Sequence, residues 1–173
     1  MTSWYDIISL DRPSSMSKEE MRQLYSQQEI RESVGIVTRL IEEEVSALNG
    51  KHEQVYIGGF SQGCAISLAT FLLYRAGRLG GCVGLSGGQS TIIDYDTEVD
   101  LPLKRQTKMF LYHGEDDEVI ACENASKTYD EFHDLGLDFT FEKEAGLGHS
   151  LSMGEIRKLA TFFNTLMSDL PVP

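Results

Sequence analysis

A serine lies between two glycines in the segment Gly-Phe-Ser-Gln-Gly at residues 59–63. The apolar residues 55–58 precede it and the small, mostly apolar residues 64–69 follow it, which predicts a strand, a sharp turn and a helix with Ser61 at the bend. A tight, strained turn leaves no room for Cβ atoms at the two flanking positions, which explains the glycines, and it pushes the serine hydroxyl outward. The pattern predicts a nucleophile, and the motif alone leaves open a strand-to-helix turn without chemistry.

A serine nucleophile needs a histidine as base, and the histidine needs a carboxylate to orient it. Residues 108–113 are predicted to form a buried strand that runs into Glu115, Asp116 and Asp117. Residues 139–142 alternate like a strand and lead into a glycine-rich loop with His149. Active sites of open parallel sheets form beyond the carboxyl ends of the strands, so these residues are the candidates. Spacing alone does not choose among the three acids.

Other residues compete for the same roles. His52 and His133 are predicted to be solvated surface residues, and His113, at the end of a strand, is predicted to hydrogen bond to a neighbouring loop. His149 has the order and setting that a base requires. Ser86 follows a predicted strand at residues 81–85, but no helix starts after it, so we expect it to shape its loop rather than act as a nucleophile.

Five segments together resemble a known family. They are Ser-Trp-Tyr-Asp-Ile at residues 3–7, Gly-Gly-Phe-Ser-Gln-Gly at 58–63, Leu-Ser-Gly at 85–87, His-Gly-Glu-Asp-Asp-Glu-Val-Ile at 113–120 and Gly-His-Ser at 148–150. In combination they resemble the acyl-protein thioesterases and related carboxylesterases, the lysophospholipase/carboxylesterase group of the α/β-hydrolase superfamily. The resemblance covers nearly the whole chain.

The resemblance implies a role for individual residues. It implies that Ser61 is the nucleophile, Asp117 the acid and His149 the base of a catalytic triad, and that the backbone N–H of Gln62 is an oxyanion donor.

The resemblance also concerns the substrate. Ile7, Ile8 and Val119 match positions near the acyl-binding cleft of the family, with ordinary core packing as the alternative for each.

One departure from the family concerns the start of the chain. Family members carry a further segment before Ser-Trp-Tyr-Asp, with strands and a His-Gly loop that supplies part of the oxyanion hole, and no counterpart precedes Ser3 here. We therefore expect residues 1–173 to form a single, N-terminally incomplete α/β-hydrolase domain. In this domain the strand at residues 55–60 lies at an exposed edge, and the second oxyanion donor has no visible source.

Composition narrows the class of protein. The 173 residues are 41% hydrophobic, enough for one core, and the net charge of −12 argues against nucleic-acid binding and against a polybasic membrane surface. The sequence has no apolar run of about 18 residues, so we expect no stable membrane insertion. The cysteines are three in number and lack metal-ligand spacing, which favours reduced thiols in the cytoplasm. No feature indicates a particular oligomeric state.

The predicted elements alternate between strands and helices, which favours an α/β fold with a mostly parallel sheet and helices on both faces. Ser17 and Glu20 have the spacing of a capping box and predict a helix that continues with helical periodicity to Asn49. Residues 89–105 are predicted to be a long loop.

These observations predict a serine hydrolase that cleaves acyl thioesters or carboxylic esters through an acyl-enzyme. Its substrate would be an S-acylated protein or a small acyl ester, and the reaction needs no metal or other cofactor. One alternative is a non-catalytic pseudoenzyme or fragment that lacks the oxyanion-hole strand and binds an acylated partner. Another is a different serine hydrolase activity, such as that of a peptidase or a small-ester hydrolase.

Overall fold

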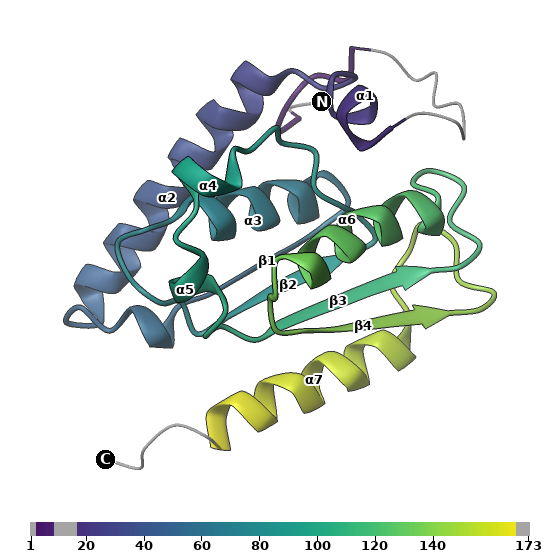
Figure 1. Cartoon of the computed structure of the whole chain (residues 1–173). Helices are drawn as coiled ribbons and strands as arrows, with labels where there is room; N and C mark the ends of the chain where they lie inside the picture. The colour runs from purple at the N-terminus through teal and green to yellow at the C-terminus, as the bar shows by residue number, and fades with distance from the viewer. Residues whose placement is uncertain (1–2, 9–16, 169–173) are drawn as a thin grey trace.

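The computed structural model describes residues 3–8 and 17–168 (Figure 1). Its centre is a four-stranded, all-parallel sheet in the order β1-β2-β3-β4. The strands are β1 (Tyr56–Phe60), β2 (Gly81–Leu85), β3 (Met109–Gly114) and β4 (Phe139–Glu144). All four predicted strands are confirmed, and so is the α/β class with a parallel sheet.

The described helices range from one turn to more than five turns in length. They are α1 (Lys18–Arg22), α2 (Gln27–Ala47), the 3₁₀ turn His52–Gln54, α3 (Gln62–Leu73), α4 (Tyr95–Glu98), α5 (Leu101–Lys104), α6 (Cys122–Asp134) and α7 (Met153–Ser168).

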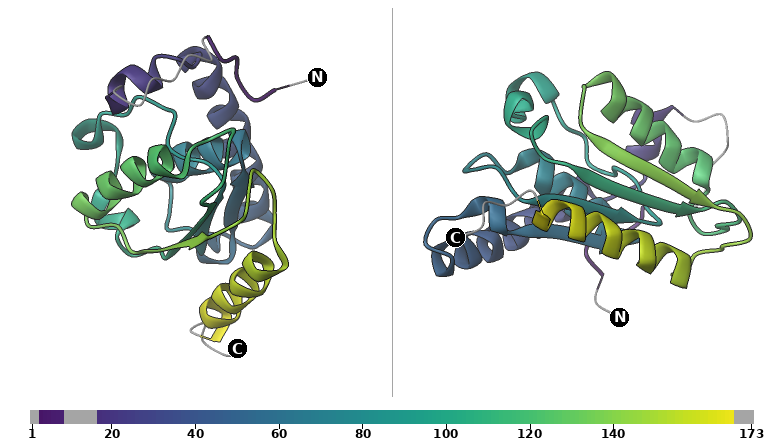
Figure 2. Two further views of the ribbon diagram at one scale, coloured as in Figure 1. Left: turned by 90° about the vertical axis from the view of Figure 1, so that its right-hand side faces the viewer. Right: turned by 90° about the horizontal axis from the view of Figure 1, so that it is seen from below.

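The helices form a layer on each face of the sheet. The connections through α3, through α4 and α5, and through α6 cover one face, with α2 packed outside α3 (Figures 1 and 2). After β4 the chain crosses to the opposite face, where α7 packs (Figure 2). Because each parallel connection returns over the same face, the strands follow one another in chain order across the sheet.

The strand register places two sets of side chains on opposite faces. Ile57, Cys82 and Met109 are partners in one row and belong to the core beneath α3 and α6. The neighbouring row carries Val83 and Phe110 toward α7. All residues of β3 are buried, as is typical of an interior parallel strand covered on both faces.

Two sequence predictions about local structure are wrong in part. Ser17 and Glu20 do form the capping box, since Ser17 Oγ donates to Glu20 Oε2 at 2.8 Å, but the helix that it starts ends at Arg22. The long helix has its own N-cap, Ser26, whose hydroxyl accepts from the N–H of Glu29. Between them the backbone leaves the helical path to pair with residues 7 and 8.

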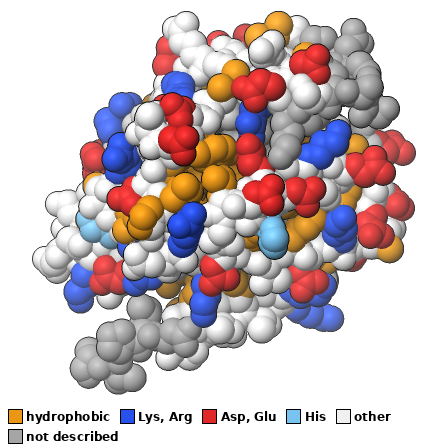
Figure 3. Space-filling model, in the orientation of Figure 1, with side chains coloured by type: hydrophobic (Ala, Val, Ile, Leu, Met, Phe, Trp, Pro, Cys, Tyr) orange, Lys and Arg blue, Asp and Glu red, His pale blue; other side chains and the backbone are white. Residues whose placement is uncertain are grey.

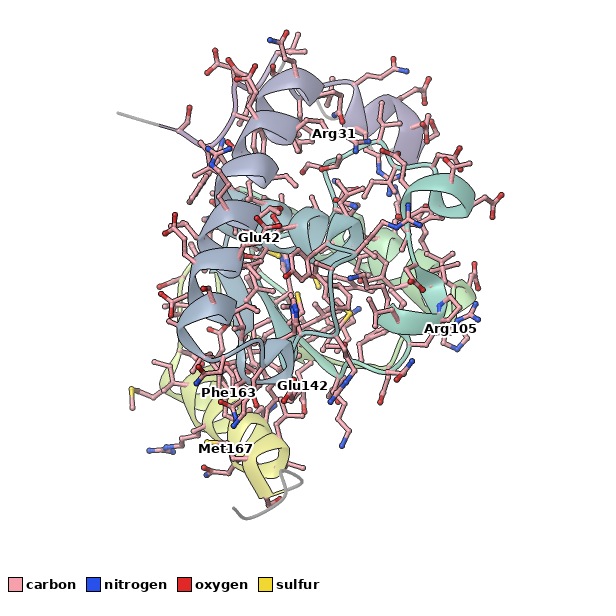
Figure 4. The ribbon with its side chains drawn as sticks, turned by 90° about the vertical axis from the view of Figure 1, so that its left-hand side faces the viewer. Arg31, Glu42, Arg105, Glu142, Phe163 and Met167 are labelled. Atoms are coloured by element: carbon pink, nitrogen blue, oxygen red, sulfur yellow. The ribbon has the colours of Figure 1, made fainter. Side chains whose placement is uncertain are left out.

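The predicted loop at residues 89–105 is the second case, because it contains the short helices α4 and α5. Aspartates cap both: Asp94 accepts from the N–H of Asp96, and Asp100 accepts from the N–H of Leu103. An ion pair also ties α4 to α2: Nη1 of Arg31 lies 2.6 Å from Oε1 of Glu98. Arg31 is labelled in Figure 4.

Strand β1 is an edge of the sheet. Among the described residues it pairs with β2 and with no strand on its outer side, as predicted. An apolar groove of about 230 Å³ lies along it on the α7 face, lined by Val83, Leu85 and Leu159 among others, and by Phe163, which is labelled in Figure 4. The nucleophile candidate therefore follows a strand that is supported from one side.

Candidate active site

Ser61 occupies a strained turn between β1 and α3. Its backbone has φ 57° and ψ −121°, a left-handed conformation that non-glycine residues rarely adopt. Its N–H donates to the carbonyl of Leu85 on β2 at 2.9 Å, which fixes the turn against the sheet. A Cβ on Gly59 would lie 2.3 Å from the backbone of Gly63, so the turn requires glycine at position 59.

Gly63 is different from Gly59. The nearest atom to a Cβ built there would be Nε1 of Trp4 at 3.9 Å, an ordinary van der Waals contact. The expectation that a lack of space requires both flanking glycines is therefore wrong for Gly63.

Three residues distant in the sequence meet at this turn. His149 Nε2 lies 2.8 Å from Ser61 Oγ, and His149 Nδ1 lies 2.7 Å from Asp117 Oδ2. The His149 side chain keeps 17% of its surface exposed, while the carboxylate of Asp117 is fully buried. The ring of Phe60 packs against the imidazole, with the ring centroids 4.8 Å apart. This arrangement can move a proton from the hydroxyl to the imidazole and stabilise the imidazolium that forms.

The loop after β3 holds the carboxylate of Asp117 in place. Oδ1 accepts from the N–H groups of Val119 and Ile120 at 2.9 and 2.8 Å, which leaves Oδ2 for His149. Glu115 and Asp116 are exposed instead. The geometry therefore selects Asp117 among the three acids that spacing left open.

A second histidine supports the same loop. His113 is fully buried; its Nε2 lies 2.7 Å from the carbonyl of Ile120 and 3.3 Å from Asp117 Oδ2. Burial lowers the pKa of His113, so the ring is neutral at physiological pH and donates from Nε2. The predicted hydrogen bond to a neighbouring loop is confirmed.

The remaining competitors lie away from the relay. The side chain of His133 is exposed, as predicted, but His52 is half-buried and its Nδ1 lies 3.0 Å from the hydroxyl of Tyr74, so the surface prediction is wrong for His52. Its ring packs where a side chain on Gly77 would lie. Ser86 is buried and its N–H donates to the carbonyl of Tyr112, which agrees with a loop-shaping role.

The amino end of α3 presents backbone donors beside Ser61. The N–H groups of Cys64 and Ala65 donate to the carbonyl of Ser61, whereas those of Gln62 and Gly63 have no acceptor in the described part of the chain. Helix N-termini carry partial positive charge and favour anions. The structure thus places the predicted oxyanion donor, the N–H of Gln62, at an open helix terminus next to the hydroxyl.

The thiol of Cys64 follows these donors on the first turn of α3. It is fully buried, and burial raises its pKa to about 12, so it packs as a thiol against the sheet. Cys82 and Cys122 are also buried and free of disulfides.

Comparison with known proteins decides the family. The family model for phospholipases and carboxylesterases matches residues 1–167. The chain belongs to the phospholipase/carboxylesterase family. "Acyl-protein thioesterase 1 homolog 1" of Dictyostelium discoideum is 33% identical over 95% of this chain and 67% of its own length. "Acyl-protein thioesterase 1" of Yarrowia lipolytica is 38% identical over 90% of this chain and 65% of its own length.

A solved structure gives the same result for the fold. A crystal structure of a variant of Arabidopsis thaliana SOBER1 superimposes with a TM-score of 0.80 at 27% identity, covering 95% of this chain and 74% of that one. The chain spans about two thirds of the length of these curated relatives. Members of the family are serine hydrolases, and the relay of Ser61, His149 and Asp117 has the geometry that such chemistry needs.

Exposed apolar side chains lie on the segments around the relay. Ile7, Ile8 and Val119 are 38%, 69% and 58% exposed, so the alternative of ordinary core packing is wrong for all three. Sequence reasoning missed Trp4 and Leu151, which are also exposed. The available signal was that Trp4 lies three residues before Ile7 and Leu151 two residues after His149. It was missed because apolar residues near a site were expected to be core.

The surface charge and the hydropathy of the helices bear on possible partners. The face in Figure 3 carries acidic side chains interspersed with Lys and Arg, and shows no extended basic patch. Among residues 3–8 and 17–168, no helix has the length and apolar character needed to span a bilayer.

Proposed function

We propose that this chain is a serine hydrolase that cleaves acyl thioesters or carboxylic esters through an acyl-enzyme. The observation that carries the proposal is the continuous relay from Ser61 Oγ through His149 to Asp117, with distances of 2.8 and 2.7 Å. It lies at a strained strand-to-helix turn, where the hydroxyl is held out of the sheet.

The first half of the reaction forms the acyl-enzyme. Ser61 Oγ attacks the acyl carbonyl carbon while His149 Nε2 takes the hydroxyl proton, and the imidazolium then gives that proton to the departing thiolate or alkoxide. In the second half, water attacks the acyl-enzyme and loses its proton to His149. Collapse of the intermediate releases the carboxylic acid and returns a proton to Ser61. Asp117 keeps its charge and holds Nδ1–H throughout.

The oxyanion of each tetrahedral intermediate would be stabilised at the amino end of α3. The N–H of Gln62 is the donor that the family resemblance assigns, and the N–H of Gly63 is a second open donor in the same turn. Loss of one oxyanion donor typically lowers turnover by about a hundred- to a thousandfold, so the number of working donors decides how fast this chain reacts.

The substrate class follows from the surroundings of the site. Val119, whose N–H donates to Asp117, and Ile7 and Ile8 on the segment that contacts Gln62 present exposed apolar surface, which suits the hydrocarbon of an acyl chain. The relatives described above are called acyl-protein thioesterases, so S-acylated proteins are the first class to test, with small acyl esters as the second. Free buried thiols fit a reducing compartment, and we propose the cytoplasm.

A competing function is non-catalytic binding of an acylated partner. The unpaired outer edge of β1 favours it, because the strand that carries the nucleophile lacks a neighbour on one side in the described structure. With no strand described beyond this edge, the oxyanion donors that the structure shows are those at the amino end of α3.

A fluorophosphonate probe separates the two functions. The probe should label the purified 173-residue chain, and Ser61→Ala should abolish the labelling while circular dichroism shows both proteins folded. A folded chain that resists the probe would contradict the hydrolase and favour the binding function. If labelling succeeds, rates with matched thioesters and oxygen esters of increasing chain length distinguish a thioesterase from a small-ester hydrolase, and a peptide substrate tests for a peptidase.

A further inference from the structure

Residues 3–8, here called the amino-terminal strap, are held at the start of α3 by one side chain. The N–H of Trp4 donates to Oε1 of Gln62 at 3.3 Å, and Nε2 of Gln62 donates to the carbonyl of Tyr5 at 3.2 Å. A primary amide offers an acceptor and a donor side by side, as a peptide backbone does, so Gln62 pairs with the strap on both atoms. The residue that follows the nucleophile therefore contacts a segment almost 60 positions away.

Other contacts hold the rest of the strap to the body of the molecule. Ser33 Oγ on α2 donates to the carbonyl of Trp4 at 2.6 Å, and the N–H of Ile8 donates to the carbonyl of Leu24 at 2.6 Å. Tyr5 is buried between α2 and α3. Gln62 thus supplies the side-chain hydrogen bonds that tie the strap to the active-site turn. Tyr5 packs between α2 and α3, and the hydrogen bonds of Ser33 and Leu24 tie the strap to α2 and to the segment before it.

The strap also carries exposed apolar side chains, of which Trp4 lies close to the active-site turn. Trp4 Nε1 comes within 3.9 Å of the Cβ position of Gly63, two residues after the nucleophile. Trp4, Ile7 and Ile8 are all exposed, so they contribute little to the core and remain available to a ligand. Their position relative to Ser61 depends on the strap staying docked, because the hydrogen bonds of Gln62 join the strap to the turn that carries Ser61.

We propose that the side chain of Gln62 is a positioning residue that docks the strap beside Ser61 and thereby sets a preference for long acyl chains. It acts through the strap residues Trp4, Ile7 and Ile8, while its backbone N–H is the proposed oxyanion donor. The inference rests on the proposed hydrolase function for its effect on substrates, and the docking itself stands independently of catalysis.

The docking is tested by fluorescence, since Trp4 is the only tryptophan in the sequence. Gln62→Ala and Gln62→Met both remove the amide, and Met keeps most of the side-chain volume. Trp4 is 43% exposed when docked, so release should shift its emission to the red and raise acrylamide quenching by about twofold. Gln28→Ala removes an exposed glutamine of α2 whose Nε2 donates to Glu32 on the same helix, and it should leave the emission unchanged. Unchanged quenching in both Gln62 variants would overturn the docking.

The effect on substrates is tested by the ratio of kcat/KM for p-nitrophenyl octanoate to that for p-nitrophenyl acetate. We expect this ratio to fall about tenfold in Gln62→Ala and in Gln62→Met, mainly through KM for octanoate, as loss of one or two neutral hydrogen bonds predicts. Ser33→Ala, which removes a different anchor of Trp4, should lower the ratio in the same direction, and Gln28→Ala should keep it.

The outcomes separate this inference from the proposed function. A released Trp4 with an unchanged ratio, or a normal ratio in Gln62→Met, would overturn the specificity role. A wild-type chain inactive on both esters would overturn the hydrolase and with it the specificity role, while the quenching result would still decide whether Gln62 docks the strap. If Gln62→Ala fails to fold by circular dichroism, Ser33→Ala with the same two measurements decides the matter.

Discussion

The backbone strain at Ser61 should appear as a difference in stability between two variants. Ser61→Gly and Ser61→Ala both remove the hydroxyl and its bond to His149, so the difference between these variants isolates the backbone at φ 57° and ψ −121°. Holding a non-glycine residue in such a region costs about 1–3 kcal/mol, and glycine escapes this cost. Glycine also raises the conformational entropy of the unfolded chain, which lowers stability by about 0.5–1 kcal/mol relative to alanine. We therefore expect Ser61→Gly to be more stable than Ser61→Ala by about 0.5–2 kcal/mol.

Ser26 provides the matched control. Both serines are N-cap residues, but Ser26 has an ordinary φ of −65°, so glycine and alanine at position 26 differ through capping and chain entropy alone. Subtracting the difference at position 26 from that at position 61 leaves the strain.

Urea unfolding, followed by circular dichroism, gives the free energy of unfolding of all four variants, provided that its slope with urea concentration is the same in each. For a chain of this size, 1 kcal/mol corresponds to about 2–4 °C in Tm, so thermal melts give a second reading. The fluorophosphonate probe should fail on both Ser61 variants and succeed on both Ser26 variants. If glycine stabilises position 61 no more than position 26, the argument that the fold stores strain at the nucleophile is wrong.

Four further substitutions test the packing and electrostatics of the fold. Gly59→Ala should destabilise by about 3 kcal/mol or more and abolish probe labelling, because its Cβ would lie 2.3 Å from backbone atoms, whereas Gly63→Ala should melt like the wild type. Burial lowers the pKa of Lys104 to about 8, so the unfolded chain binds more protons above that pH, and urea titrations should show the wild type gaining stability relative to Lys104→Met from pH 8 to pH 10. Burial raises the pKa of Glu155, so its charged form opposes folding; Glu155→Gln should raise Tm at pH 7, with the gain disappearing as the pH falls below about 4.5.

The fold was predictable where the signal is local. The strands at residues 56–60, 81–85 and 109–114 are mostly apolar runs bounded by turns, and the strand at 139–144 begins with alternating apolar and polar residues. The alternation of these strands with helices fixes a parallel sheet with covered faces. The break between α1 and α2 was missed, although Ser26 and Glu29 have the capping-box spacing that marks a new helix start. It arises from pairing of Tyr25 with Ile7, a contact that no local pattern encodes.

The candidate site divides in the same way. Ser61 and His149 could be chosen from motif and order, but the choice of Asp117 over its acidic neighbours depends on which carboxylate turns inward to the N–H groups of Val119 and Ile120. The contact of Gln62 with the strap joins distant segments through a side chain whose neighbours in sequence give no sign of it. Sequence patterns report the geometry of one element, whereas these choices depend on how two elements meet.

The position of Ser61 at the end of an edge strand has a consequence for how the strain is held. In the described structure the turn is fixed from the β2 side, where Leu85 accepts its N–H, and from α3, whose first turn packs Cys64 against the space beside Gly84. Strain persists only where the surroundings determine the backbone more strongly than the residue's own preference. Because β1 lacks an outer neighbour here, contacts with β2 and α3 must supply that determination. Substitutions that loosen these contacts should therefore lower probe labelling before they unfold the sheet, since the turn relaxes while the paired strands remain.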